Sequence, residues 1–413
     1  MAHIKTEVES FARIQVIGVG GSGKNATNHM INAKVRGVDF LAINTDSQDL
    51  QNSLAPRKIH IGKNLTKGLG AGMNPEVGKN AAEETRAEVQ EALKNADMVF
   101  VAGGLGGGTC TGAGPVVAKI AKEMGALTIG VVTKPFMFEG QRRMRLAEEG
   151  LTELSKSVDA LIVVPNDKLL GAISKDTTAK EAFAMSDEVL KQAVEGISQL
   201  ITTPGQVGNI DFADIRAVLE NAGSALMGIG TASGENRATE AAKAAISSPL
   251  IDVSIHGAKG VLFSIAGNDD LTMFEITEAA RVITESVDPD AKIIFGTIRD
   301  EKLKKNEIQV TVIAANFPDK LTAVRNIFRD RDSMVQDSVA HQNDSVAAPS
   351  KTGKIFNSLG GMFSKDESNN QASSVEEVVD DTVSSSNVMK PAPDSIEDDW
   401  NAVPAFLRRS KGR

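Results

Sequence analysis

Cysteine and histidine are too scarce in this 413-residue sequence to build a covalent or metal-bound framework. A single cysteine excludes a disulfide framework. The five histidines stand far apart, with no pair at the spacing typical of metal ligands, so we expect no structural metal. They are His3, His29, His60, His256 and His341.

Long apolar runs and an excess of positive charge are also missing. No apolar stretch approaches the length needed to span a bilayer, and residues 1–11 are mixed and acidic where a signal peptide would be basic and then apolar. The formal net charge of −9 argues against a general affinity for nucleic acid or anionic lipid. We therefore expect a cytoplasmic protein with no nucleic-acid partner and no direct insertion into membranes.

What the first 177 residues do contain is a regular alternation of apolar and amphipathic segments. Strand-like runs at 12–19, 38–46, 97–104, 126–135 and 160–167 alternate with helical patterns at 20–36, 75–95 and 115–124. This order predicts an α/β fold whose parallel sheet is covered on both faces. Ligands bind beyond the carboxyl ends of parallel strands, so the residues at these ends should share one site. They are Gly20, Asn44, Gly104, Thr133 and Asn166.

The rest of the chain changes character three times. A long helical pattern is predicted over 178–204, and mixed helices and strands over 205–317 predict a smaller α+β domain. Residues 318–395 form a C-terminal flank and a linker: from about residue 331 the hydrophobic periodicity is lost and Ser, Asn and Asp are frequent, which is typical of disorder. Large apolar residues return beside cations in 396–413, so we expect a tethered peptide ligand there.

Residues 18–25, GVGGSGKN, fit two phosphate-binding patterns at once. Gly18, Gly20 and Gly23 match the G-x-G-x-x-G of dinucleotide-binding folds, whereas Gly18, Gly23 and Lys24 match a Walker A loop up to its last residue. Asn25 stands where a Walker loop needs a hydroxyl for Mg²⁺, and an amide is a poor substitute. The loop on its own therefore leaves its ligand undecided.

A second glycine loop, GGLGGGTCTGAG at 103–114, decides in favour of phosphate binding. It has seven glycines in twelve residues, more than tight packing of a strand against a helix requires. It follows a predicted strand and precedes a helix that we expect to begin at Pro115. Backbone N–H groups of such a loop can surround a phosphate, the helix N-terminus adds a favourable dipole, and Thr109 and Thr111 supply hydroxyl donors.

The second loop resembles the G-G-G-T-G-[ST]-G signature of the tubulin superfamily, and the chain resembles its FtsZ family of bacterial cell-division GTPases over nearly the whole length. The resemblance rests on GVGGSGKNA, NTD at 44–46, LTKGLGAGMNPEVG, GGGTCTGAG, KPFMFEGQRR, VPNDKL, NIDFADI and VPAFLRR, in that order. It implies a tubulin-like GTP-binding domain at 1–177, with GTP or GDP bound and Mg²⁺ arriving with the triphosphate. The positions assigned to the nucleotide are Gly20, Gly21, Ser22, Gly23, Lys24, Asn25, Asn44, Gly104, Gly106, Gly107, Gly108, Thr109, Cys110, Thr133, Glu139, Arg143, Asn166, Phe183 and Asp187.

Two pairs spaced four residues apart gain a role from this resemblance. Glu139 and Arg143 would share one face of a helix and approach the ribose and phosphates; a solvated ion pair is the alternative. Phe183 can stack on a purine, and Asp187 can accept hydrogen bonds from guanine N1 and the exocyclic amine, which adenine cannot supply. Core packing is the alternative for Phe183 alone, but together with Asn166 the pair favours guanine recognition.

The motif NIDFADI at 209–215 supplies the candidate catalytic residues Asn209, Asp211 and Asp214. Carboxylates there can orient water and help to hold a cation, as phosphoryl transfer to water requires; a mere helix cap is the alternative. The resemblance implies that this motif completes the nucleotide site of the next subunit. Such a head-to-tail interface does not close, so it produces a homopolymer whose assembly switches hydrolysis on.

The resemblance also implies partners and a location. AVPAFLRR resembles the peptide through which FtsZ binds membrane-tethering and regulatory division proteins, with Trp400, Phe406 and Leu407 as apolar contacts and Arg408 and Arg409 as cations. A solubilising tail is the alternative, and the exposed aromatic residues fit it poorly. The expected location is a ring at the mid-cell division site in the cytoplasm.

Three positions depart from the family pattern. Cys110 replaces a glycine, and we expect some backbone strain there; it is either a tolerated variation or a thiol activated by the helix N-terminus. Ser22 and Lys24 replace the commoner Gly and Asn, and Lys24 either contacts phosphate or points to solvent.

Two other functions fit less well. A dinucleotide oxidoreductase would use Asp46 but leaves the second glycine loop without a role, and a non-hydrolysing scaffold leaves Asp211 and Asp214 without one.

Overall fold

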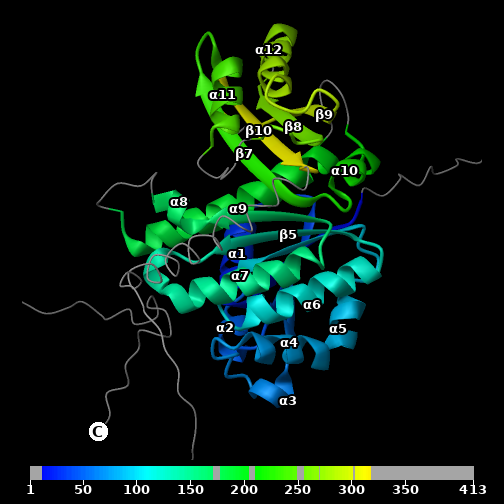
Figure 1. The fold of residues 1–413 in the computed structure, drawn as a ribbon, viewed down its shortest axis with the longest axis vertical. Coiled ribbons are helices and arrows are strands. Elements are labelled where there is room, and N and C mark those ends of the chain that lie inside the picture. Colours follow the sequence, from blue (N-terminus) through cyan, green and yellow to red (C-terminus); the bar gives the residue numbers. More distant parts are fainter. Residues whose placement is uncertain are drawn as a thin grey trace, which may run out of the picture. The chain divides into compact units, whose positions relative to one another are not determined.

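The computed structural model describes residues 12–170, 177–203, 210–248, 255–268, 270–300 and 303–317. The predicted linker and the predicted peptide at 396–413 lie outside these ranges. Figure 1 colours the described elements by their order along the chain, with the early strands and helices in blue and cyan and the later ones in green and yellow.

A parallel sheet organises the first part of the chain, as predicted. Its strands are β1 (Ile14–Val19), β2 (Val38–Asn44), β3 (Arg57–His60), β4 (Met98–Gly104), β5 (Leu127–Lys134) and β6 (Ala160–Pro165). They lie in the order β3-β2-β1-β4-β5-β6, and every neighbouring pair is parallel. All their carboxyl ends therefore meet at one edge, where the sequence places the glycine loops.

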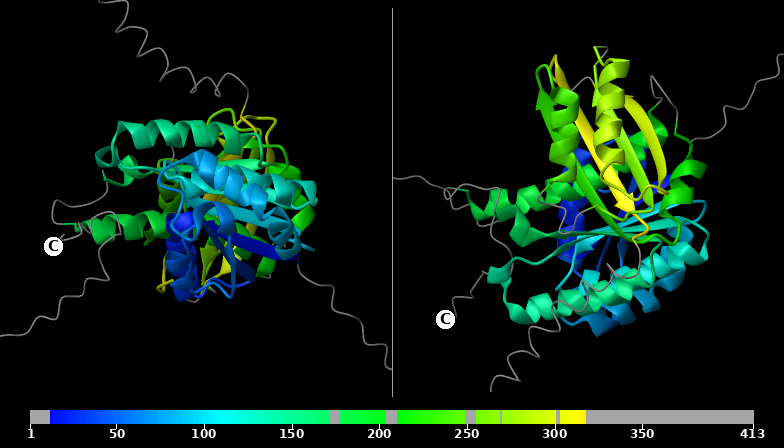
Figure 2. Two further views of the ribbon diagram at one scale, coloured as in Figure 1. Left: turned by 90° about the horizontal axis from the view of Figure 1, so that it is seen from below. Right: turned by 45° about the horizontal axis from the view of Figure 1, so that its top comes forward.

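Helices cover both faces of this sheet (Figures 1 and 2). The connecting helices are α1 (Gly20–Asn32), α2 (Ser47–Gln51), α3 (Lys63–Thr66), α4 (Pro75–Glu84), α5 (Arg86–Ala92), α6 (Thr109–Glu123), α7 (Gln141–Ser155) and α8 (Asn166–Leu170), with a 3₁₀ turn η1 (Met137–Glu139) before α7. Alternate residues of each strand enter different cores. Val16 packs with α1 and the long helix α9 (Ala179–Thr202), whereas Ile17 packs with α4 to α6.

The second part of the chain extends the same sheet. It contains α10 (Phe212–Leu219), β7 (Gly223–Ser233), α11 (Arg237–Ile246), β8 (Gly260–Gly267), α12 (Met273–Thr284), β9 (Lys292–Arg299) and β10 (Glu307–Ala315). Strand β7 pairs with β6 in parallel through Gly223 to Ala225, and β10 then pairs antiparallel with both β7 and β8. The mixed helices and strands confirm the predicted α/β architecture with a smaller α+β part, while the exact domain boundaries stay predictions.

Two helix boundaries differ from the sequence prediction. The single helix expected over 75–95 is two helices, because Thr85 leaves helical geometry and separates α4 from α5. The helix expected to begin at Pro115 begins at Thr109 instead, so Pro115 lies inside α6. The second glycine loop is therefore shorter than predicted, and its threonines belong to the first turn of the helix. None of the helices in the described part of the chain combines the length and apolar character that a bilayer crossing requires.

Candidate functional site

The two glycine loops contact each other at the carboxyl edge of the sheet. Gly20 begins α1 with φ of +73°, and a methyl group on it would lie 3.3 Å from Cβ of Thr109. A methyl group on Gly104 would lie 2.8 Å from Oγ of Ser22. Neither loop has room for a larger side chain at these two positions. The predicted site residues of the two loops therefore line one continuous surface.

The N-terminus of α6 is open toward this surface. The capping residue is Gly108, so no side chain at the cap accepts from the N–H groups of the first turn, and no acidic residue lies in that turn. These N–H groups and the helix dipole therefore suit an anion. Thr111 is buried, and its Oγ1 accepts a hydrogen bond from the Gly106 backbone N–H at 2.9 Å, which closes the loop. A Cβ at Gly107 would meet nothing within 4 Å. The loop can accommodate a phosphate at Gly107 and Gly108.

Threonines join the second loop to the neighbouring strands. Oγ1 of Thr109 lies 2.7 Å from Oγ1 of Thr45, just beyond β2. Thr133 is buried at the end of β5, and its carbonyl accepts a hydrogen bond from the Leu105 backbone N–H at 3.0 Å. The strand-end prediction thus brings Thr133 to the second loop. Thr45 was missed, although it lies within the NTD motif.

A buried ion pair stands behind the first loop. Lys24 is 9% exposed, and its Nζ lies 2.6 Å from Oδ1 of Asp49; Oδ2 of Asp49 accepts a hydrogen bond from Nδ2 of Asn44 at 2.8 Å. The expectation that Lys24 might point to solvent is wrong, because its ammonium is held by this carboxylate. Asp49 was missed by sequence reasoning. Its place in the first turn of α2, capped by Asp46, was readable, but its contact with α1 was not.

Asn25 and Asp46 have different surroundings. Asn25 is exposed on α1, one residue after the buried lysine, so its amide is available to a ligand at the surface of the loop. Asp46 accepts hydrogen bonds from the backbone N–H groups of Gln48 and Asp49 and so caps α2. The carboxylate that a dinucleotide oxidoreductase would direct at a ribose therefore already has a structural role.

Aromatic and polar residues gather at the start of α9. Phe183 is 42% exposed, and its ring lies edge-on to Phe136 with 5.3 Å between centroids, so part of the ring packs and part is free. Asn166 is buried at the end of β6, and its Oδ1 accepts a hydrogen bond from Ser186 Oγ at 3.0 Å. Both predicted residues thus reach the same part of α9.

Asp187 lies one turn beyond Phe183 on the same helix. Burial raises the pKa of its carboxyl to about 7, while the charges of His29 and Lys24 act in the opposite direction. The carboxyl in this environment therefore gains or loses its proton near neutral pH. Guanine, which donates two hydrogen bonds at its Watson–Crick edge, would favour the anion.

Glu139 and Arg143 form an ion pair but do not share a helix, which corrects the prediction. Nη1 of Arg143 lies 2.8 Å from Oε2 of Glu139. Glu139 ends η1 and Arg143 lies in α7, because Gly140 between them adopts φ of +97° and interrupts the helix. Nε of Arg143 is buried without a hydrogen-bond partner among the described residues. A buried guanidinium N–H without a partner beside the loop at Gly106 suits an oxygen of a bound ligand.

Cys110 lies in the first turn of α6 and shows neither the expected backbone strain nor the surroundings of an activated thiol. Its φ is not among the positive values of the described residues, so the predicted backbone strain is absent. The thiol is buried, and burial raises its pKa to about 12, which opposes activation by the helix N-terminus. The geometry fits a tolerated variation, since Cys110 packs with apolar residues of the core.

Asp211 and Asp214 lie far from these loops. Asp211 caps α10 by accepting from the Phe212 backbone N–H at 2.6 Å, and Asp214 accepts in turn from the Asp211 backbone N–H at 3.3 Å. The predicted alternative of a helix cap is thus confirmed for Asp211, whose side chain nevertheless stays exposed. Asn209 lies outside the described residues.

The position of α10 follows from a contact of its last turn. Nη2 of Arg216 donates to the carbonyl of Gly125 at 3.4 Å, and Gly125 lies two residues before β5 begins at Leu127. Helix α10 therefore lies at the amino ends of the strands, whereas the glycine loops lie at the carboxyl ends. In Figure 1, α8 and α10 mark these opposite ends.

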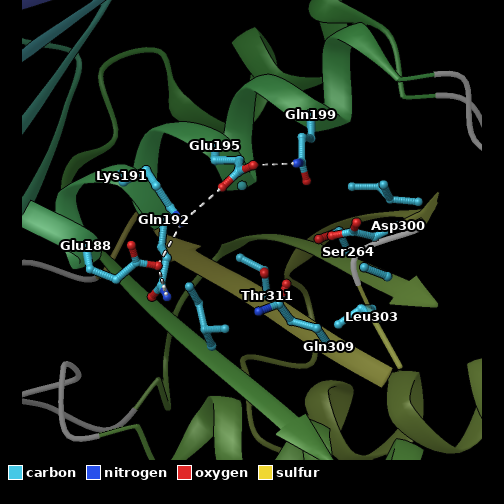
Figure 3. Close-up of a pocket in the computed structure, with 14 residues that line it drawn as sticks. Glu188, Lys191, Gln192, Glu195, Gln199, Ser264, Asp300, Leu303, Gln309 and Thr311 are labelled. Atoms are coloured by element: carbon cyan, nitrogen blue, oxygen red, sulfur yellow. Dashed lines mark hydrogen bonds and ion pairs between the residues drawn. The ribbon is translucent and has the colours of Figure 1, made fainter. Parts of the chain in front are cut away.

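The described residues show no metal-binding cluster, and they form a hollow away from the glycine loops. No group of three carboxylate, histidine or cysteine side chains among them is arranged to hold a metal ion. A hollow of about 200 Å³ lies along another side of α9, between Glu188, Lys191 and Glu195 and the strands that carry Ser264 and Thr311 (Figure 3). None of the predicted site residues lines it. This hollow is therefore separate from the glycine-loop surface.

Two family descriptions match the chain. The one described as "Tubulin/FtsZ family, GTPase domain" matches residues 13–174, and the one described as "FtsZ family, C-terminal domain" matches residues 223–318. An empty FtsZ dimer from M. jannaschii is 45% identical with a TM-score of 0.71, covering 75% of this chain and 89% of that one. A mutant of M. jannaschii FtsZ is 46% identical with a TM-score of 0.70, covering 74% and 91%. A GTPγS-bound protofilament of CetZ2 from Haloferax volcanii is 22% identical, has a TM-score of 0.65, covers 78% and 99%, and shows a common fold.

Proposed function

The chain belongs to the tubulin/FtsZ family of GTPases, and we propose that it hydrolyses GTP at a site shared between successive copies in a head-to-tail filament. Each copy would supply the glycine loops for one nucleotide and Asp211 and Asp214 for the nucleotide of its neighbour. The capping carboxylates of Asp211, which is exposed, and Asp214, which is partly exposed, lie at the opposite end of the sheet and carry this proposal.

In the proposed complex, the phosphates lie on Gly107 and Gly108 at the N-terminus of α6, with the first loop beside them. Phe183 stacks on the base, and Asp187 with Asn166 reads its hydrogen-bonding edge. Asn25, Glu139 and Arg143 bind around the ribose and phosphates. Mg²⁺ would arrive with the triphosphate, because the described residues offer it no cage of their own, and it would neutralise charge developing on the phosphates.

Distance argues for a second copy. Strand β5 has eight residues, and strands rise about 3.3 Å per residue, so its ends are roughly 25 Å apart. The loops lie at one end of this span and Arg216 of α10 contacts the other. Asp211 and Asp214 therefore cannot reach a γ-phosphate on their own chain. A neighbouring copy stacked along the strand direction brings the two ends together.

The chemistry then follows from the two halves. The loops hold the triphosphate in line for attack, and Asp214 orients the water and accepts its proton, with Asp211 and Asn209 as further candidates for this role. Since neither half is complete alone, assembly switches hydrolysis on. Loss of the γ-phosphate weakens the contact across the interface, so GDP-bound filaments turn over.

Exposed apolar residues at the nucleotide end support a covering partner. Met137 is 77% exposed and Phe138 is 66% exposed, just beyond the carboxyl end of β5. The Phe138 ring stacks on Phe136 and also meets Phe183, with centroids 6.4 Å apart. Apolar patches beside a site often mark interaction surfaces. The related structures described as an FtsZ dimer and a CetZ2 protofilament are consistent with self-association.

The proposed cellular role is a cytoplasmic division ring at mid-cell. The peptide at 396–413 would recruit membrane-tethering and regulatory proteins through Trp400, Phe406 and Leu407, with Arg408 and Arg409 meeting acidic groups. This segment lies outside the described residues, so its role rests on the resemblance of its sequence.

The test is the GTP hydrolysis rate per subunit as a function of protein concentration, with Mg²⁺ present. The proposal predicts a rate near zero below a threshold concentration and a rising rate above it, in step with sedimentable polymer. A constant rate per subunit at all concentrations contradicts it. Polymer without hydrolysis would instead favour the non-hydrolysing scaffold.

A further inference from the structure

Thr45 lies between β2 and α2, and its hydroxyl group is directed at the nucleotide site from behind. The residue is 0% exposed. Its Oγ1 lies 2.7 Å from Oγ1 of Thr109, the first residue of α6. A methyl group on Gly20 of the first loop would lie 3.3 Å from Cβ of Thr109, so Thr109 stands where the two glycine loops meet. Thr45 therefore reaches the surface of the site only through Thr109.

The backbone of Thr45 is held in place by two side chains. Its carbonyl oxygen accepts a hydrogen bond from Oγ1 of Thr66 at 3.1 Å and lies 3.2 Å from Nε2 of His60. Thr66 is itself buried. Because both its main chain and its side chain are enclosed, Thr45 presents its hydroxyl to Thr109 from a fixed position.

Burial decides which of the two hydroxyls donates. A hydroxyl has a single proton to give, and the buried Thr45 cannot give its proton to bulk water. Among the described residues, the acceptor that the Thr45 hydroxyl has is Oγ1 of Thr109. With the bond in the other direction, the Thr45 proton would be buried without an acceptor, which is unfavourable. Thr45 is therefore the donor and Thr109 the acceptor.

This direction leaves the proton of Thr109 free for a ligand. Thr109 is partly exposed, and its hydroxyl makes no second hydrogen bond within the part of the chain that the structure describes. Phosphate oxygens at neutral pH mainly accept hydrogen bonds, so they match a hydroxyl whose proton points outward. A hydroxyl that already accepts a hydrogen bond is also polarised into a stronger donor.

We propose that Thr45 is a positioning residue for phosphate binding: by donating to Thr109, it directs the Thr109 proton toward a phosphate oxygen of the bound nucleotide. This inference rests on the proposed placement of the phosphates at the N-terminus of α6. It gives Thr45 no contact of its own with the nucleotide.

The experiment measures the affinity of the full-length protein for GDP and for a non-hydrolysable GTP analogue by equilibrium dialysis, below the concentration at which polymer sediments. Thr109→Val identifies the nucleotide whose phosphate Thr109 contacts. Thr45→Val removes the orienting hydroxyl and keeps the shape of the side chain. Thr45→Ser and Thr45→Ala form a second pair, since both lack the methyl group and differ by the hydroxyl alone.

A matched control removes a buried hydroxyl from the other end of the sheet. Thr128 is 0% exposed, and its Oγ1 donates to the carbonyl of Ala126 at 3.0 Å, near the start of β5. Thr128→Val loses a buried hydrogen bond of the same kind, far from the glycine loops. It should bind both nucleotides as the wild type does.

The expected effects follow the hydroxyl of Thr45. Thr109→Val should weaken binding by about tenfold, as the loss of a hydrogen bond to a charged group does. Thr45→Val should weaken it by about fivefold, and Thr45→Ser should stay within about twofold of wild type. Thr45→Ala should bind about fivefold more weakly than Thr45→Ser. Adding Thr45→Val to Thr109→Val should cause no further loss, because no hydroxyl remains to be oriented.

Other results would overturn the inference. Equal affinities of Thr45→Ser and Thr45→Ala, or a Thr45→Val loss that is undiminished beside Thr109→Val, would mean that Thr45 acts by packing. Circular dichroism of the apo variants checks that they fold, and if Thr45→Val does not, the Thr45→Ser and Thr45→Ala pair decides the question.

The same data separate this inference from the function on which it rests. If Thr109→Val weakens binding while Thr45→Val does not, the placement of the phosphates stands and only the role of Thr45 is wrong. If Thr109→Val binds both nucleotides as tightly as wild type, the proposed placement of the phosphates on Thr109 is wrong, and the role of Thr45 is excluded with it.

Discussion

The two ends of the parallel sheet use their carboxylates differently. At the amino end, Asp159 is buried and fully partnered: it accepts from the Thr128 backbone N–H at 2.9 Å and lies 2.8 Å from Nζ of Lys122. At the carboxyl end, Asp187 is largely buried, yet no hydrogen bond to it is found among the described residues, and burial raises its pKa. Asp159 stabilises the fold, whereas Asp187 is the carboxylate to which we assign a ligand.

The same contrast explains why α10 is the exception at the amino end. Among the described residues, the hydrogen bonds of Asp211 and Asp214 go to the first turn of their own helix, and Asp211 is exposed. In our proposal they bind the nucleotide of a second copy. On this proposal, burial with complete partners marks the structural carboxylates, and incomplete partnering marks those that bind nucleotide.

The largest expected effect is on catalysis. Asp214→Asn should lower the assembly-stimulated GTPase rate by about 100-fold or more, because the amide cannot accept a proton from water. An asparagine oxygen can still accept from the Asp211 backbone N–H, so α10 should remain folded. Glu220→Gln, at the other end of α10, is the matched control and should hydrolyse GTP normally. Full activity of Asp214→Asn in polymer would remove it from the mechanism.

A comparable effect on stability is expected at the amino end. Asp159→Ala leaves the buried N–H of Thr128 without its partner and removes the ion pair with Lys122, and should lower the free energy of unfolding by about 3 kcal/mol. Urea denaturation followed by circular dichroism measures the change. Glu153→Gln, which breaks the exposed pair with Lys156, should change it little. GDP affinity of the folded Asp159→Ala protein should be unaltered. A large loss of affinity would contradict a purely structural role for the carboxylate at the amino end.

A smaller effect is expected in the second glycine loop. Gly106 has φ of +91°, and a methyl group there would approach the carbonyl oxygen of Arg143 to 2.7 Å, so Gly106→Ala should destabilise the loop by about 1–2 kcal/mol. GDP binding should weaken accordingly. Gly107→Ala meets open space and should leave the unfolding midpoint of the apo protein unchanged. Equal destabilisation by the two variants would contradict the local geometry.

The smallest expected effect concerns pH. The pKa of Asp187 in the folded protein is about 7, above its ordinary value, so the folded state holds the proton more tightly. Stability of the apo protein should therefore fall as pH rises from about 4 to 7 and then level off. Asp187→Asn removes this loss, and should be more stable than wild type at pH 8 by on the order of 1 kcal/mol, with the advantage shrinking at pH 5. Thermal unfolding at both pH values measures it; an advantage of the same size at pH 5 would exclude titration as its cause.

Sequence reasoning succeeded where the signal is local and periodic. The strands, the long helix α9 with its capping Thr178, and the meeting of the strand ends follow from apolar runs and from the common direction of parallel strands. The glycine loops were readable for the same reason, because their composition departs so far from ordinary turns.

It failed where a single dihedral angle or a distant contact decides. The positive φ of Gly140 separates Glu139 from Arg143, and Thr85 divides a pattern that reads as one helix. Asp49 is 25 residues from the lysine that it holds, so neither periodicity nor spacing could pair them. The contact of β7 with β6, which joins the two parts of the sheet, is likewise a tertiary event.

A mixing experiment tests most directly whether the site is divided between two copies. Asp211→Asn/Asp214→Asn subunits keep the loops but lack the acids, and Asp187→Ala subunits keep the acids but bind nucleotide weakly. Neither should hydrolyse GTP well alone. In a random equal mixture about a quarter of interfaces combine an intact loop surface with intact acids, so the account predicts about a quarter of the wild-type rate, in co-sedimenting polymer. A mixture that co-polymerises yet stays as inactive as its components would contradict a site shared between subunits.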